Sequence, residues 1–389
     1  MSLFVLPPLS LYVHLPWCVR KCPYCDFNSH ERSDIPEQAY LKALLEDWQT
    51  ELAHVQGRAL QSIFFGGGTP SLMSGDFYHQ LIAALRSTID FADDIEITLE
   101  ANPGTVEQGR FEQYRAAGIN RLSIGVQSFN PAHLHKLGRI HSSNEAIVAA
   151  ESARQAGFDN FNLDLMHGLP QQSTAQALED IEQALALQPT HLSWYELTIE
   201  PNTAFFHQPP EQPDGDAMAD TEEAGFALLA QHGFQRYEIS AFAQAGRNAR
   251  HNMNYWLFGD YLAIGAGAHG KITQPQHNHI MRYQKTRQPD AYMNGQGSRS
   301  RQPRQLAPEE LTLEYFLNTL RLVEGAPTEL FSARTGQPLC VAEDLLRRMG
   351  TDHLLSMRNA HIQCSALGLQ HLNTVLAKIE SAAAARIPQ

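Results

Sequence analysis

Three of the chain's five cysteines lie within eight residues, in the sequence CVRKCPYC at positions 18–25. Thiolates are soft ligands that suit iron–sulfur clusters, zinc or copper(I). A cubane iron–sulfur cluster takes four attachments, and Cys18, Cys22 and Cys25 supply three, which would leave the fourth iron open for a substrate or cofactor. Cys340 and Cys364 lie far away in the sequence, and we expect them to be ordinary thiols.

A zinc site is the alternative for the same loop. Zinc usually takes four protein ligands, and the imidazole of His14 or His30 would complete a tetrahedron with the three cysteines. From residue types and spacing alone, both kinds of metal centre stay open.

A second group of candidate residues stands at the ends of predicted strands. These are the glycine run 66–68 with Thr69, then Glu100, Gln127, Arg139 and Asp164. In a parallel barrel the carboxyl ends of the strands meet at one face, so we expect these residues to surround one ligand. Glycines let the backbone approach a ligand closely. The carboxylates can accept hydrogen bonds from ribose hydroxyls, and a guanidinium can bind a carboxylate through two N–H groups.

The elements that position these residues are short apolar runs that alternate with helical patterns. Strands are expected at Leu11–His14, Ser62–Phe65, Ile95–Glu100, Arg121–Val126, Asn160–Leu165 and Leu192–Leu197. Helices are expected from Pro36 to Val55, with Glu37 as a first-turn cap, and at about 76–87, 107–117, 143–157 and 174–187, with Gly118 and Gly157 as stop signals. Such repeats predict an α/β fold with a parallel sheet. Six units are too few for the eight-unit closed barrel, which favours an open or partial (β/α)6-type barrel.

The second half of the chain has a different pattern. The proline-rich residues 201–216 predict a loop, and a helix at about 217–232 leads into Tyr237–Phe242. Residues 275–308, rich in Gln, Arg, Pro and Gly, are interpreted as a linker to a small, mostly α-helical C-terminal region. We therefore expect a barrel domain at residues 1–300 and a helical domain at 301–389.

Composition excludes several classes of protein. The formal charge of −13 argues against sequence-independent binding of nucleic acid, which needs basic charge. No apolar run reaches the ~18 to 20 residues that cross a bilayer, and no positively charged segment precedes an apolar stretch at the N-terminus. Five cysteines are too few for a secreted disulfide framework. These features predict a soluble cytoplasmic protein.

The cysteine loop resembles the signature of the radical S-adenosylmethionine superfamily, C-x3-C-x2-C with an aromatic residue before the third cysteine, here Tyr24. The resemblance implies a [4Fe–4S] cluster on Cys18, Cys22 and Cys25. It also implies that the amino and carboxylate groups of S-adenosylmethionine chelate the open iron, and that reduction of the cluster can cleave the sulfonium.

Within the superfamily, the chain resembles the HemN/HemW group, which contains the oxygen-independent coproporphyrinogen III oxidases and their relatives. The motifs are LYVHLPWC, GGGTP, EANP, GVQSF, LGRIH and DLMHGLP, in this order, and the group also carries a small helical C-terminal domain. The resemblance implies that S-adenosylmethionine is contacted by Tyr12, Tyr24, Gly67, Gly68, Thr69, Glu100, Gln127, Arg139 and Asp164.

Three features favour the HemW-like branch of this group, described as heme chaperones that deliver heme to respiratory proteins. Phe27 stands where the oxidases carry a fourth cysteine, and only about ten residues precede Leu11. The block His251-Asn-Met-Asn-Tyr255-Trp256 resembles the proposed heme-contact motif, because imidazole is a good axial ligand and aromatic rings suit a flat macrocycle.

The resemblance thus implies a protein that binds heme and an iron–sulfur cluster and passes heme to a recipient, in the cytoplasm or at the inner membrane face. An oxidase that removes propionate carboxyls by radical chemistry is the alternative, and a zinc-binding structural protein is the third class. Whether the chain has enzymatic activity, and whether it forms a homodimer, stays open at this stage.

Overall fold

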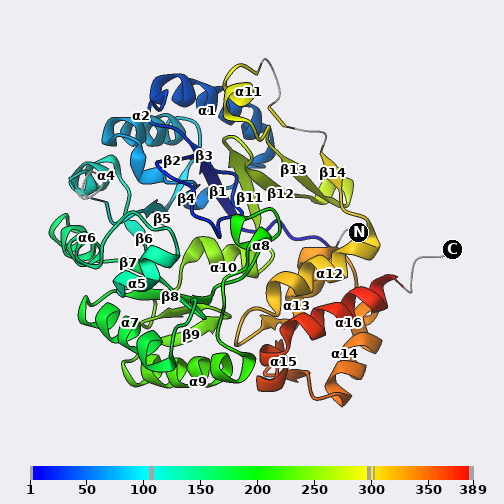
Figure 1. Ribbon diagram of the computed structural model, residues 1–389. Coiled ribbons are helices and arrows are strands. Elements are labelled where there is room, and N and C mark those ends of the chain that lie inside the picture. The colour runs from blue at the N-terminus through cyan, green and yellow to red at the C-terminus, as the bar shows by residue number, and fades with distance from the viewer. Residues whose placement is uncertain (1–2, 105–108, 296–298, 301–302, 385–389) are drawn as a thin grey trace.

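The computed structural model describes residues 3–104, 109–295, 299–300 and 303–384 (Figure 1). Over these residues, twelve strands form one mixed sheet in the order β14-β13-β12-β11-β1-β4-β5-β6-β7-β8-β10-β9. Its centre is a run of parallel strands: β11 (Asp260–Ile264), β1 (Leu9–Leu15), β4 (Leu60–Gly67), β5 (Phe91–Ala101), β6 (Arg121–Gln127), β7 (Phe161–His167) and β8 (His191–Glu196). The order is linear, so this is an open barrel. The six predicted strands are confirmed, and β11 is an addition.

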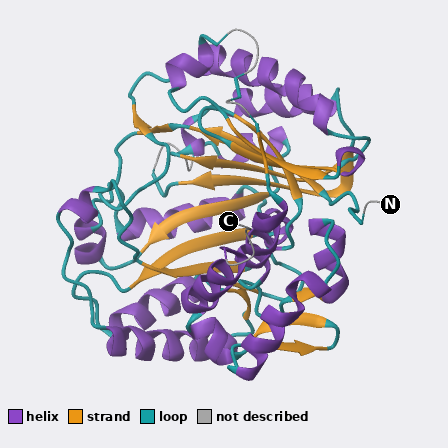
Figure 2. Ribbon diagram, turned by 90° about the vertical axis from the view of Figure 1, so that its right-hand side faces the viewer, coloured by secondary structure: helices purple, strands orange, loops and turns teal. Residues whose placement is uncertain are grey.

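Helices cover the outside of the sheet, as Figure 2 shows. The helices around the parallel strands are α1 (Glu37–Glu51), α2 (Gly75–Arg86), α4 (Phe111–Ala117), α5 (Pro131–Lys136), α6 (Ser143–Gln155), α7 (Thr174–Ala186) and α9 (Gly215–Gln231). Reciprocal capping boxes start α6 and α7, between Ser142 and Glu145 and between Ser173 and Gln176. The predicted helices are confirmed; the one expected at about 107–117 corresponds to α4, and residues 107–108 lie outside the described part of the chain.

Three details of the predicted helix ends can be compared with the structure. Gly118 and Gly157 follow α4 and α6 with φ of +105° and +83°, the left-handed conformation expected of stop signals. The predicted cap by Glu37 is wrong. Its carboxylate accepts hydrogen bonds from the backbone N–H (2.9 Å) and the hydroxyl (2.6 Å) of Ser74, so it fastens α1 to the start of α2 instead.

Residues 275–308 are not the expected linker. They contain a 3-10 turn at Pro275–His277, then β13 (His279–Gln284), α11 (Pro289–Met293) and β14 (Arg304–Gln305), which extend the main sheet beyond β12 (His269–Gln274). The polar composition of this stretch obscured two buried side chains on β13, Ile280 and Tyr283. Lys285 is also fully buried, because Asp47 and Glu51 each lie 2.6 Å from its ammonium group.

The antiparallel strands β9 (Gln235–Glu238) and β10 (Ala241–Ala243) pair beside β8 and account for the predicted stretch Tyr237–Phe242. Of the predicted loop 201–216, residues 201–214 connect β8 to α9 and carry the short helix α8 (Ala204–His207), whereas 215–216 begin α9. None of the described helices combines the length and apolar composition needed to cross a membrane.

The C-terminal region is mostly helical, as expected, and packs beside the barrel (Figure 1). It consists of α12 (Pro308–Thr319), α13 (Thr328–Thr335), α14 (Cys340–Thr351), α15 (Ala366–Gln370) and α16 (Leu372–Ala384), with the small described sheet β15 (Ala326–Pro327), β17 (His361–Cys364) and β16 (Leu355–Arg358). Its hydrophobic core also takes in Phe4, Phe258 and Ile280, so the two regions share apolar packing. A domain boundary at residue 300 stays a prediction.

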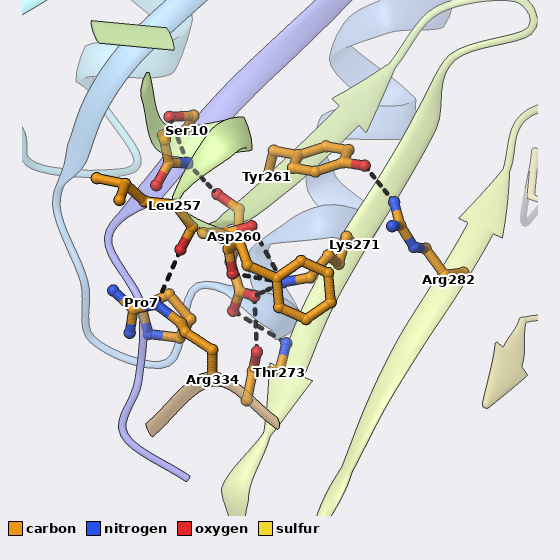
Figure 3. A network of polar contacts seen from close by, with 12 residues as sticks. Pro7, Ser10, Leu257, Asp260, Tyr261, Lys271, Thr273, Arg282 and Arg334 are labelled. Carbon is orange, nitrogen blue, oxygen red and sulfur yellow. Dashed lines mark hydrogen bonds and ion pairs between the residues drawn. The ribbon is translucent and has the colours of Figure 1, made fainter. Parts of the chain in front are cut away.

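The helix α10 (Arg250–Trp256) leads into β11 through a tight corner that a buried polar network holds (Figure 3). The carboxylate of Asp260 accepts hydrogen bonds from Arg58 (2.8 Å), from the ammonium of Lys271 (3.2 Å) and from the backbone and hydroxyl of Thr273 (2.9 and 2.8 Å). Arg334 of α13 donates to the carbonyl of Leu257 at the same corner. The network thereby ties together α10, the sheet and the C-terminal region.

Candidate functional site

A cavity of about 360 Å³ lies where the carboxyl ends of the parallel strands meet the cysteine loop. The loop starts at β2 (Trp17–Cys18) and returns at β3 (His30–Glu31), and these two short strands pair with each other. Because the loop is held at both ends beside β1, its three cysteines all line the cavity.

The cysteines fit an iron–sulfur cluster. A hydrogen-bond donor lies near each sulfur: the Thr69 hydroxyl 3.5 Å from Cys18 Sγ, Arg139 Nη1 3.6 Å from Cys22 Sγ, and the Ser29 hydroxyl 3.8 Å from Cys25 Sγ. Burial raises the pKa of the Cys18 and Cys25 thiols, and a bound metal would offset that cost because it holds the thiolate form.

The glycine run lets the backbone of the cluster loop pack directly against the end of β4. A Cβ atom on Gly68 would lie 2.5 Å from the Trp17 carbonyl oxygen and 3.0 Å from Cys18 Sγ. No side chain fits at these distances, so the loop approaches β4 closely only because residue 68 is glycine.

The histidines proposed for a zinc alternative are engaged elsewhere. Both ring nitrogens of His14 are within 2.9 Å of a partner, the Tyr12 hydroxyl and the Asn28 carbonyl, and burial lowers its pKa to about 4. His30 Nε2 lies 3.3 Å from the Asn28 side-chain oxygen. Among the described residues, no group of three or more His, Cys, Asp and Glu side chains is arranged to hold a single metal ion.

All but one of the residues predicted to contact S-adenosylmethionine line this cavity. The lining members are Tyr24, Gly67, Gly68, Thr69, Glu100, Gln127, Arg139 and Asp164. Tyr12 is the exception, because its ring lies deeper in the barrel and stacks on Phe64 with the ring centres 6.3 Å apart. The cavity therefore brings together groups from four consecutive parallel strands and from the loop after α5.

Two of the carboxyl groups that line the cavity, those of Glu100 and Asp164, are largely withdrawn from water. Withdrawal from water, together with the neighbouring Asp164, raises the pKa of Glu100 to about 8, while the backbone N–H of Gly67 (3.1 Å) partly offsets this. Burial also raises the pKa of Asp164, although Asn162 (2.8 Å) and Ser123 (3.1 Å) donate to its carboxylate. Such carboxyls are suited to bind hydroxyl groups or a positively charged ligand.

Arg139 is anchored by contacts that leave its position little freedom. Its Nη2 donates to the Asn102 side chain and to the Gly125 carbonyl, both at 2.7 Å, in addition to the Cys22 contact. Gln127 is anchored in a similar way, since its side-chain oxygen accepts from the Tyr195 hydroxyl at 2.8 Å. Its φ of +71° stands beside a register shift between β6 and β7, a bulge that turns the strand end toward the cavity.

Of the three residues predicted to contact heme, one lines the cavity and two, His251 and Tyr255, do not. Trp256 lines the cavity, whereas His251 is 3% exposed and does not. The His251 ring packs against Phe64 and Tyr255, with ring centres 5.0 Å apart in each case, and its Nδ1 lies 3.1 Å from the Ser62 hydroxyl. Burial lowers the pKa of His251 to about 3, which keeps the imidazole neutral, and its Nε2 has no hydrogen-bond partner among the described residues.

Several lining residues were missed at the level of the sequence. They are Phe27, Pro70, Ala101, Asn102, Ser123, Gly125, Ser193, Tyr195, Glu238, Ser240, Ala241, Asn252 and Arg321. Asn102 belongs to the EANP motif, and Ser123, Ser193 and Tyr195 lie on predicted strands, so alternation along the strands could have found them. Nothing in the sequence around Arg321 signals the cavity.

Comparison with known proteins agrees with this site. The profile of the radical SAM superfamily matches residues 12–184. A Haemophilus influenzae protein named heme chaperone HemW is 53% identical over 336 residues, 85% of this chain and 87% of that protein. The Escherichia coli heme chaperone HemW is 52% identical over 343 residues, 88% and 89% of the two chains. The structure of coproporphyrinogen III oxidase (HemN) from Escherichia coli, a radical SAM enzyme, matches the fold with a TM-score of 0.80 and 24% identity, over 97% of this chain and 91% of that one.

Proposed function

This chain belongs to the HemW family within the radical SAM superfamily, and on that premise we propose that it is a heme chaperone, which binds heme and passes it to a recipient protein. The observation that carries the proposal is the identity of 52–53% with two heme chaperones over most of both chains. The radical SAM family implies a [4Fe–4S] cluster and S-adenosylmethionine as cofactors.

We assign the cluster to Cys18, Cys22 and Cys25, and S-adenosylmethionine to the cavity beside them. When bound, a reduced cluster would supply an electron for cleavage of the sulfonium. Arg139 would stabilise the thiolate of Cys22 and keep a positive charge beside the cluster. Glu100 and Asp164 would accept hydrogen bonds from ligand hydroxyls, and Gly67 and Gly68 would let the ligand approach the backbone.

The alternative function is that of a coproporphyrinogen III oxidase. The HemN structure shares the fold at 24% identity, and a similarity at this level supports a common architecture but not a common function. The position that carries a further cysteine in the oxidases is Phe27 here, a side chain that is 63% exposed at the cavity. We therefore favour heme transfer over propionate decarboxylation.

For heme we propose contacts from His251, Tyr255 and Trp256. His251 would have to become exposed before its Nε2 could bind iron, since the ring is enclosed by Tyr12, Phe64 and Tyr255. A respiratory protein as recipient, contact with the inner membrane face and a homodimer stay predictions from the sequence.

The test is anaerobic reconstitution of the full chain followed by heme titration and by an assay with coproporphyrinogen III. We expect heme binding, transfer to a heme-free recipient protein, and no protoporphyrinogen. Rapid conversion of coproporphyrinogen III would overturn the chaperone assignment in favour of the oxidase.

His251→Ala tests the heme contact separately from the cluster. Its matched control is His371→Ala, because His371 is exposed at the junction of α15 and α16. We expect a changed heme spectrum for His251→Ala alone, with the iron and sulfide content of both variants unchanged. An unaltered heme spectrum and affinity would remove His251 from the heme site.

A further inference from the structure

One wall of the cavity comes from elements that carry none of the residues assigned to S-adenosylmethionine. It consists of Glu238, Ser240, Asn252, Trp256 and Arg321, which we call the Arg321 wall. Its members come from the end of β9 and the turn that follows it, from α10, and from the segment after α12 of the C-terminal region. Two parts of the chain far apart in the sequence therefore meet at one ligand-sized cavity.

Backbone pairing holds Arg321 in this wall. The next residue, Leu322, forms an isolated antiparallel bridge with Glu238, and the Val323 N–H donates to the Tyr237 carbonyl at 3.1 Å. Residues 322–323 are therefore held beside the end of β9 by backbone pairing. Arg321, the residue before the bridge, lines the cavity.

The guanidinium of Arg321 makes a cation–π contact with the indole of Trp256, with its central carbon over the ring and 4.4 Å from the ring centre. Arg321 Nη2 donates to the carboxylate of Glu238 at 3.2 Å, which accounts for one of five guanidinium N–H donors. The carboxylate of Glu238 is also held by the backbone N–H of Ser240 at 3.0 Å. Because the carboxylate of Glu238 offsets much of the positive charge of Arg321, this wall would recognise a ligand mainly through hydrogen bonds from its N–H groups and less through net charge.

Two buried N–H groups of the wall have no acceptor. Arg321 Nε and Trp256 Nε1 are both out of contact with water, and neither has a hydrogen-bond partner among the described residues. Buried donors are normally satisfied. Neither of these two atoms is open to the cavity as the side chains stand, so a ligand acceptor would reach them only when the Arg321 side chain, which is 30% exposed, shifts on the indole. A carboxylate suits both, because it offers two oxygens and binds a guanidinium through charge-assisted hydrogen bonds.

We propose that Arg321 and the indole N–H of Trp256 bind a propionate carboxylate of heme. The inference rests on the proposed function and adds to it a recognition residue from the C-terminal region. The propionate end of the macrocycle would lie at this wall, next to the space assigned to S-adenosylmethionine. The C-terminal region thereby takes part in heme binding through Arg321.

The test compares two ligands on the anaerobically reconstituted full chain: heme with free propionates and heme dimethyl ester, in which both carboxylates are masked. The variants are Arg321→Gln, Arg321→Lys, which keeps the charge opposite Glu238, and Trp256→Phe, which keeps an aromatic ring without the N–H. The control is Arg347→Gln, since Arg347 is 72% exposed and pairs only with Asp344 at 3.0 Å among the described residues. Each titration is paired with measurement of iron content and of S-adenosylmethionine affinity.

We expect wild type and the control to bind heme about 10- to 100-fold more tightly than the ester, the range for loss of a charge-assisted hydrogen bond. Arg321→Gln should bind heme and heme dimethyl ester equally, with the affinity that wild type has for the ester. Arg321→Lys and Trp256→Phe should still prefer heme over the ester, but by a smaller factor than wild type. Iron content and S-adenosylmethionine affinity should stay unchanged in all variants.

Three results would overturn the inference. An Arg321→Gln protein that prefers heme over the ester as strongly as wild type would remove Arg321 from propionate binding. A loss of S-adenosylmethionine affinity alone would assign Arg321 to that cofactor instead. If the wild type bound no heme, the proposed function itself would fail, an outcome distinct from the first two.

Discussion

Replacing Asp260 by Asn should destabilise the protein by breaking the network at the corner between α10 and β11 (Figure 3). Asp260 is fully buried and its carboxylate is paired with Lys271, which is 1% exposed, and with Arg58. Asparagine has nearly the same shape but no charge. The change therefore leaves a buried ammonium without its counter-charge while the packing is preserved.

The expected cost follows from the burial of the pair. Removal of one partner from a buried ion pair costs about 3–5 kcal/mol, because the remaining charge is uncompensated. The unfolding entropy of a chain of 389 residues is about 0.8 kcal/mol/K if the chain unfolds as one unit. A loss of about 4 kcal/mol then lowers Tm by about 5 °C.

The assay is differential scanning calorimetry of the cluster-free protein, with a double-mutant cycle. Lys271→Met removes the ammonium and keeps the apolar stem, so the double variant Asp260→Asn/Lys271→Met should be less destabilised than the sum of the single variants. The control Asp352→Asn makes the same substitution in an exposed ion pair with Lys378, where both side chains are about half exposed. This control should cost less than about 1 kcal/mol.

Two outcomes would refute the reasoning. If Asp260→Asn lowered the unfolding free energy no more than Asp352→Asn, burial of the pair would not determine its contribution. If the single changes added to within about 0.5 kcal/mol, Asp260 and Lys271 would be energetically independent despite their contact.

Two further predictions concern a buried carboxyl and the cluster loop. Burial raises the pKa of Asp180 from 3.8 to about 6, so folding favours its protonated form. This protonated carboxyl stabilises the fold fully below pH 3.8, and the stabilisation, up to about 3 kcal/mol, is lost as the pH rises through 6. Between pH 4 and 7, the unfolding free energy of Asp180→Asn, measured with urea, should therefore lack this decrease. Parallel plots of unfolding free energy against pH for wild type and variant would contradict the prediction. Gly68→Ala should lower the iron-to-protein ratio after anaerobic reconstitution, because the added methyl group meets the Trp17 carbonyl and Cys18, whereas the control Gly215→Ala meets nothing within 4 Å. Equal iron content would refute the steric argument.

The parts of the site that could be predicted from the sequence have local causes. The cysteine loop places three sulfurs within eight residues, so its chemistry does not depend on distant contacts. The apolar runs then indicated where each strand ends, and parallel strands bring their carboxyl ends together at one face of the barrel. Tyr12 shows the limit of this reasoning. It lies on the same face of β1 as His14, two residues deeper along the strand, and stacks on Phe64 away from the cavity.

What the sequence by itself determined is therefore the family, the cluster loop and the run of strand–helix units, since each depends on residues close together along the chain. Tertiary structure alone decided that the polar stretch 275–308 adds strands to the sheet, because Lys285 is buried only through its pairing with Asp47 and Glu51. It also decided that His251 is enclosed while Arg321 reaches the cavity. The bridge between Leu322 and Glu238 that places Arg321 joins segments more than 80 residues apart, and no local pattern encodes such a pairing.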